Sequence, residues 1–289
     1  MKHLLLLTFI ICIGSNDSLA QNSSSAVRKG ADATNFELPD TTNRLDEVEV
    51  SAKAYPQTQL VGPYKQPAWT LVRKFPATRV YLMVPPGSNM YEKWVDMRVP
   101  KKGPAEVRFR DEFAFGLGKR IELDLYLHTV LKGQQGEYAF DWRGFSWEVR
   151  YALADWGKIW GNPTLYFEHK ILNGFMGIEP KILLGDQIGK RSIWGLNLIY
   201  EAFLAKKRAD QEREWASTGS YGYMVNDDFT AGLSLMYRYN DIDFSDEFYA
   251  GPLIQYRFNS KAYISIETLL GTTETSKSSR NTLIFGWRF

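Results

Sequence analysis

The chain has 289 residues and a formal net charge of +2, which excludes the strongly basic surface that nucleic-acid binding requires. Its only cysteine is Cys12, so a disulfide framework and a thiolate metal site are both excluded. Aromatic residues make up 15% of the chain, yet the mean hydropathy is only −0.32, and no apolar run is long enough for a membrane-spanning helix.

The N-terminus has the pattern of a secretory signal peptide. Lys2 and His3 begin it, residues 4–13 form an apolar core, and Ser18-Leu19-Ala20 is a small-x-small cleavage site. We therefore interpret residues 1–20 as a signal peptide that is removed, and Cys12 with it.

Residues 21–90 are predicted to form an arm that is partly extended and flexible. Residues 22–60 are poor in large apolar side chains and rich in Ser, Thr, Asn, Asp and Lys. Residues 61–90 contain five prolines around the apolar patch 78–84, and prolines disfavour a central strand. We expect one strand or extended segment there, packed at the mouth of the following domain or partly inside it.

From residue 91 onward, apolar and polar residues alternate with a period of two. Repeated over about ten residues in many segments, this pattern is typical of a transmembrane β-barrel. The sequence predicts an all-β, antiparallel up-and-down barrel of about twelve strands over residues 91–289. The segments with this pattern are 95–99, 107–117, 121–127, 145–153, 162–172, 174–184, 192–205, 214–224, 229–239, 247–258, 261–271 and 280–289.

The links between these segments alternate in length. Tight polar turns are expected at 118–120, 225–228 and 259–261, and longer links at 132–139, 206–213, 240–246 and 272–279. Bacterial barrels place short turns in the periplasm and long loops outside. Two links do not fit well, because 154–161 is long for a turn and 172–174 is short for a loop, so ten or fourteen strands remain open.

The last segment has Leu283, Phe285, Trp287 and Phe289 on one face. This ending resembles the C-terminal signal by which the barrel-assembly machinery recognises bacterial outer-membrane β-barrel proteins. The resemblance implies location in the bacterial outer membrane, contact with outer-membrane lipid, and recognition by that machinery through Phe285, Trp287 and Phe289.

Residues 45–52 are an acidic pair followed by alternating valines and small residues. This stretch resembles the TonB box of TonB-dependent outer-membrane receptors. The resemblance implies a TonB-like periplasmic partner that binds Asp46, Glu47, Val48, Glu49 and Val50 by adding them as a strand to its own sheet. The alternative is a single short strand or a solvated tether, since the chain is too short for a receptor barrel with a folded plug.

The polar face of the predicted barrel carries charges of both signs. Buried charges persist only when they are paired or hydrated, so the lumen is either closed by ion pairs or a narrow pore that selects small polar solutes. The lumen-lining candidates are Arg108, Arg110, Glu112, Glu122, Asp124, Glu148, Arg150, Glu168, Lys170, Glu179, Lys181, Arg238, Arg257 and Arg288, with Glu201 and Glu267 on the same face.

The sequence predicts neither an enzyme nor a metal or cofactor site. Only His128 and His169 follow the signal peptide, and neither has the His-x-Ser spacing of outer-membrane lipid hydrolases. An omptin-like protease would require a histidine beside its acidic residues, but the acidic loop at 241–247 contains no histidine. We predict a narrow pore or solute-binding barrel for small polar molecules. The alternative is a non-conducting accessory protein of the envelope.

Overall fold

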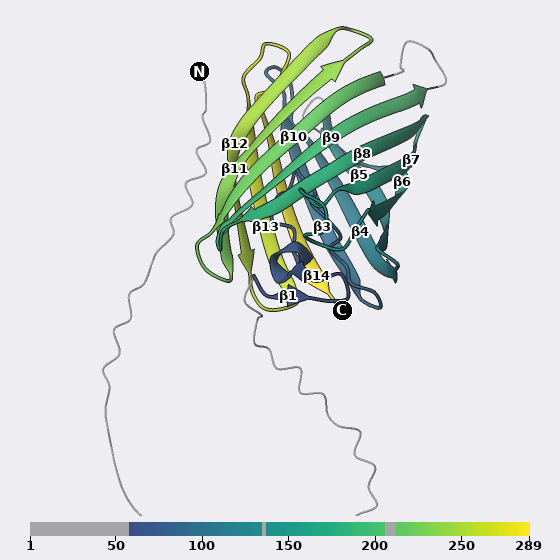
Figure 1. The fold of residues 1–289 in the computed structure, drawn as a ribbon. Helices are drawn as coiled ribbons and strands as arrows, with labels where there is room; N and C mark the ends of the chain where they lie inside the picture. Colours follow the sequence, from purple (N-terminus) through teal and green to yellow (C-terminus); the bar gives the residue numbers. More distant parts are fainter. Residues whose placement is uncertain (1–57, 135–136, 206–211) are drawn as a thin grey trace, which may run out of the picture. The chain divides into compact units, whose positions relative to one another are not determined.

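The computed structural model describes residues 58–134, 137–205 and 212–289. Within them, twelve antiparallel strands close into a barrel, because the last strand pairs with the first (Figure 1). The barrel strands are β3 (Asn89–Val99), β4 (Glu106–Gly118), β5 (Ile121–Gln134), β6 (Glu137–Ala152), β7 (Thr164–Leu172), β8 (Phe175–Ile188), β9 (Ser192–Ala205), β10 (Glu212–Met224), β11 (Phe229–Asn240), β12 (Ser245–Arg257), β13 (Ala262–Gly271) and β14 (Ser279–Arg288).

The predicted all-β barrel of about twelve strands is confirmed. Both ambiguous links belong to it: turns and bends at 153–163 connect β6 to β7, and a two-residue turn at Asn173 and Gly174 connects β7 to β8. Gly174 has φ +83°, a left-handed conformation that glycine adopts without a steric penalty. The described part of the chain contains no helix long and apolar enough to cross a membrane.

The long link expected at 132–139 is wrong, because β5 and β6 extend into it. The register between β5 and β6 shifts at His128 and Thr129, opposite Gly144. Gly144 has φ +130°, and a Cβ there would lie 2.1 Å from a backbone oxygen of β7. Because this bulge shifts the alternation by one residue, the outward side chains of β6 have odd numbers after it, as at Phe145. Before it they have even numbers, as at Phe140 and Trp142. A prediction based on strict alternation therefore begins this strand at residue 145, whereas β6 begins at Glu137.

The two faces of the wall differ as the alternation requires. Leu233 and Leu235 of β11 point outward and are 62% and 51% exposed, whereas Ser234 between them is 1% exposed. The C-terminal strand follows the same rule, with Phe285 and Trp287 outward and Ile284 buried. The barrel thus has an apolar outer surface and a polar inner surface.

Residues 58–88, here called the plug, begin at the mouth of the barrel and extend into the lumen at the end where β14 finishes (Figure 1). The plug comprises a pair of two-residue strands, β1 (Leu60–Val61) and β2 (Gln66–Pro67), the 3-10 helix η1 (Ala68–Leu71), and an irregular stretch up to β3. The sequence assigned these residues to the second half of the arm. The signal peptide and the stretch 45–52 lie outside the described residues.

Apolar contacts between the plug and the wall form the core of the molecule. Gly116 of β4 permits one close approach, since a Cβ there would lie 2.1 Å from the Pro85 carbonyl oxygen. Three buried clusters join plug and wall: Val72, Met83 and Val84 with Met90, Ala114 and Tyr263; Trp69 and Phe75 with Ile193, Met224 and Leu253; and Tyr64, Tyr81 and Leu82 with Ala152.

Candidate functional site

The inner face of the wall carries an ion cluster centred on Arg150. Its guanidinium lies 2.6 Å from Glu122 and 2.6 Å from Asp124, and it also pairs with Glu148 and, at 3.7 Å, with Glu112. All five side chains are inaccessible to solvent. β4, β5 and β6 are neighbours, so alternate residues of three consecutive strands come together here.

This cluster has four carboxylates around one arginine of the wall, and the plug adds two further arginines. Arg73 binds Glu112 at 3.1 Å, and it also binds Glu92 of β3 at 2.6 Å. Arg79 lies 3.4 Å from Glu112 and 3.6 Å from Glu148. The two plug cations therefore offset part of the negative charge that the wall alone would bury in this network.

Sequence reasoning missed Arg73, Arg79 and Glu92 as members of this network. The excess of acidic over basic residues on the inward positions of residues 112–150 is the signal that a cation must come from elsewhere. Nothing in the local pattern of the proline-rich segment shows that it supplies this cation.

Side chains of the wall also bind the backbone of the plug. Glu122 accepts hydrogen bonds from the Met83 and Val84 amides at 2.6 and 2.8 Å. Asn197 of β9 bonds both the amide and the carbonyl of Arg79, at 2.8 and 2.6 Å. Three further contacts of this kind join Glu267 to the Ala77 amide, Ser265 to the Arg73 carbonyl and Arg288 to the Leu71 carbonyl. Side chains thus take the place of a β-ladder for these buried groups.

Lys74 of the plug is the most unusual buried charge. Its ammonium donates to Thr230 at 3.2 Å and to Gln255, and it is 2% exposed. Burial lowers the pKa of Lys74 well below its ordinary value, and Arg257 lowers it further, against the opposing effect of nearby aspartates.

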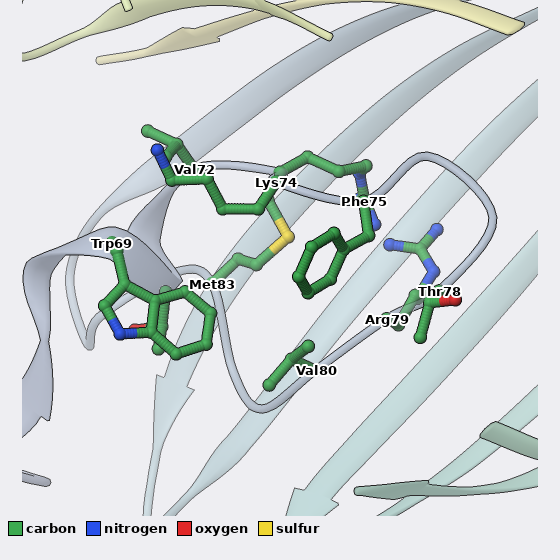
Figure 2. Close-up of a pocket in the computed structure, with 10 residues that line it drawn as sticks. Trp69, Val72, Lys74, Phe75, Thr78, Arg79, Val80 and Met83 are labelled. Atoms are coloured by element: carbon green, nitrogen blue, oxygen red, sulfur yellow. The ribbon is translucent and has the colours of Figure 1, made fainter. Parts of the chain in front are cut away.

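The plug leaves little space within itself. It encloses a cavity of about 20 Å³, toward which Phe75, Val80 and Met83 are directed (Figure 2). This volume holds about one water molecule. This cavity is therefore too small to hold a solute larger than water.

A second group of inner-face charges lies on β7 to β11. Lys170 pairs with Glu179 and Glu201, and with Glu168 at 3.7 Å. Two further pairs join Lys181 to Glu179 and Arg238 to Glu214, the latter at 2.6 Å. The other lumen candidates lie apart from both groups: Arg108 pairs with Glu106, Arg110 with Asp96, Arg257 with Asp228, and Arg288 binds the plug.

The half of the lumen away from Phe289 is here called the vestibule, with Arg98, Arg108, Arg238 and Arg280 on its wall. These side chains are partly exposed, with 42% of the Arg108 side chain and 20% of the Arg238 side chain accessible. None of their hydrogen bonds or ion pairs within the described residues involves the plug. Among the described residues, these four arginines therefore lie outside the hydrogen bonds and ion pairs that hold the plug.

The buried histidine does not assemble a hydrolase triad. His128 lies 2.8 Å from the Ser146 hydroxyl, but that hydroxyl donates its proton to Glu168 at 2.6 Å. A triad needs the histidine between the serine and the acid, so that it can take the serine proton. His169 instead packs against Trp147. No three His, Cys, Asp or Glu side chains of the described residues group as metal ligands.

No protein-family profile and no curated protein matches this chain. Among solved structures, an outer membrane channel from Pseudomonas putida F1 is similar, with 10% identity, a TM-score of 0.51, and coverage of 72% of this chain and 98% of that one. The KdgM porin has 13% identity and a TM-score of 0.49, covering 69% and 99% of the two chains. The NanC porin has 14% identity and a TM-score of 0.48, covering 68% and 97%. The described part of the chain thus shares the barrel fold of an outer-membrane channel.

Proposed function

We propose that this protein is a bacterial outer-membrane β-barrel that admits small polar solutes to its vestibule and is closed at its other end by the plug. The apolar outer face and the alternating strands support insertion in a membrane. The partly exposed Arg108 and Arg238 of the vestibule support a polar lumen at that end. In this proposal the protein is a gated narrow pore or solute-binding barrel rather than an enzyme.

The observation that carries this proposal is how the plug is held. From residue 72 to residue 84 it adds no strand to the barrel. The hydrogen bonds and ion pairs of residues 72–84 with the wall all involve side chains, such as those of Arg73, Lys74 and Arg79. Main-chain hydrogen bonds to the wall occur at Gly87 and Ser88, which bond Gly116 of β4. The twelve-stranded ladder is complete without the plug, so the plug can move without breaking the barrel.

Cysteine labelling in intact cells tests the proposed location and opening. The residues after the signal peptide contain no cysteine, so each introduced thiol is unique. Met236→Cys lies in the vestibule beside Arg280, and we expect a membrane-impermeant maleimide to label it in intact cells. Leu235→Cys, one residue away, faces lipid and should stay unlabelled although it is 51% exposed in the isolated barrel. Thr78→Cys in the plug should react only after denaturation.

Failure of Met236→Cys to react would contradict an open vestibule. Recovery of the protein in the soluble periplasmic fraction without detergent would contradict the barrel's location. The competing proposal is a non-conducting accessory protein of the envelope, and channel recordings of a variant without the plug distinguish the two.

We also propose that residues 45–52 couple the plug to a TonB-like periplasmic partner. The stretch precedes the plug by a few residues, so a pull on Asp46, Glu47, Val48, Glu49 and Val50 would act directly on residues 58–88. Recognition of Phe285, Trp287 and Phe289 by the assembly machinery is a separate proposal, supported by the place of β14 as the strand that closes the barrel.

Crosslinking tests the coupling. Cysteine at Glu47 or Glu49 should capture a periplasmic partner, and Val48→Pro should abolish the capture, because proline removes a backbone donor and fixes φ. Capture that is insensitive to the proline would show that no strand is added. The absence of any captured partner would leave residues 45–52 as a tether.

A further inference from the structure

Two arginines face each other across the β3–β14 seam of the vestibule. Arg98 and Arg280 are Cα partners in the register of these strands. Directly opposite side chains have Cβ atoms about 4.5–5.5 Å apart, and like charges at such positions destabilise a sheet. A barrel therefore keeps this pair only if something compensates for the repulsion.

The carboxylates next to the pair are already engaged. Asp96, two residues before Arg98, accepts a hydrogen bond from Thr282 at 2.6 Å and pairs with Arg110 at 3.4 Å. Glu106, the Cα partner of Arg98 on β4, pairs with Arg108. Glu247 of β12 lies 3.9 Å from Lys277.

The guanidinium groups of the pair lack acidic partners. Within residues 58–134, 137–205 and 212–289, neither Arg98 nor Arg280 forms an ion pair, and the Arg98 Nε atom is buried without a hydrogen-bond partner. Arg280 has only weak partners, the Met236 sulfur at 3.1 Å and the face of the Tyr249 ring at 5.7 Å. A buried donor without an acceptor costs about 1–3 kcal/mol, so an acceptor from outside the protein would stabilise this place.

Lys277 in the loop beside the pair adds a further positive charge to this region. Lys277 belongs to the link between β13 and β14. Burial lowers the pKa of Lys277, and Arg98, Arg280 and Arg238 lower it further, although Glu247 acts in the opposite direction.

We propose that Arg98 and Arg280 form a binding site for an oxyanion group, a carboxylate or a phosphate, of a solute that enters the vestibule. This inference rests on the proposed function, in that it names the chemical class of the solute. Guanidinium groups donate paired, charge-assisted hydrogen bonds to two oxygens of one oxyanion. An anion between the two arginines would attract both guanidinium groups and so offset their mutual repulsion. Its oxygen atoms could also accept a hydrogen bond from the Arg98 Nε. A cation would do neither, and an uncharged sugar could accept a hydrogen bond through a hydroxyl but would not offset the repulsion between the two charges.

Calorimetric titration of the purified full chain in detergent tests the site, with inorganic phosphate and citrate as probes at constant ionic strength. Arg98→Gln and Arg280→Gln should each weaken the binding of both probes by about tenfold or more, because each removes one charge-assisted donor pair. The matched control is Arg213→Gln, which removes the same charge from the exposed rim, where Arg213 pairs with Asp241 at 3.1 Å. Arg98→Lys keeps the charge without the paired donors and should bind more weakly than the natural protein.

Thermal unfolding of the same proteins gives a second readout. In chloride alone, Arg98→Gln should be at least as stable as the natural protein, because it relieves the repulsion. Phosphate should raise the unfolding temperature of the natural protein but not that of Arg98→Gln. The proposal is overturned if the natural protein binds neither probe, or if Arg98→Gln and Arg213→Gln bind them equally well. Labelling of Met236→Cys is independent of these measurements, so an open vestibule without anion binding would remove this inference alone.

Discussion

Deleting residues 58–88 together with Glu92→Gln and Glu112→Gln is expected to convert the barrel into a conducting channel. The plug fills the lumen at the Phe289 end, and its internal cavity holds about one water molecule. Removing it leaves a barrel of twelve strands, a size between filled eight-stranded barrels and open porins. In planar bilayers we expect single-channel conductance at least about tenfold above that of the intact protein.

The two glutamine substitutions keep this experiment interpretable. Arg73 binds both Glu92 and Glu112, so deletion alone would leave two buried carboxylates without their partner. The natural protein is the closed control, because the two substitutions with an intact plug would leave Arg73 buried without its acidic partners. A deletion variant that folds, as judged by heat-modifiable gel migration, but does not conduct would favour the non-conducting accessory protein.

Arg150→Met is expected to give the largest loss of stability among single substitutions in the wall. Arg150 is fully buried and is the hub for Glu122, Asp124, Glu148 and Glu112. Methionine fills a similar volume but leaves a group of buried carboxylates without their central cation. Breaking a buried ion pair from one side costs about 3–5 kcal/mol, and we expect a decrease of this size in the free energy of unfolding.

Denaturant unfolding in detergent micelles measures this loss. Arg213→Met is the matched control, because the Arg213 side chain is 55% exposed and exposed ion pairs contribute about 0–1 kcal/mol. Equal stability of the two variants would mean that the cluster is hydrated and that its carboxylates do not depend on Arg150.

The strands of the wall and the direction of their side chains could be predicted from the sequence, because the alternation that produces them is a local property of each strand. An inward and an outward residue alternate along every strand, so the faces of residues 229–239 follow from the order of their side chains alone. Closure of the barrel agrees with the even strand count. The bulge at Gly144 marks the boundary of this reasoning, since a single extra residue exchanges the two faces beyond it.

The contents of the lumen depend on contacts between residues far apart in the chain, and only the tertiary structure decided them. No periodic pattern in the sequence identifies Arg73 or Arg79 as an ion-pair partner of Glu112, because both lie in an irregular, proline-rich segment. Side chains from several strands hold each of them in place. The pairing of Arg98 with Arg280 arises only when the first and last strands meet. Alternation along one strand thus determined which residues face the lumen wherever no bulge interrupts the strand. Which of them meet depends on barrel closure and on the plug, because buried charges are compensated in three dimensions and not along the sequence.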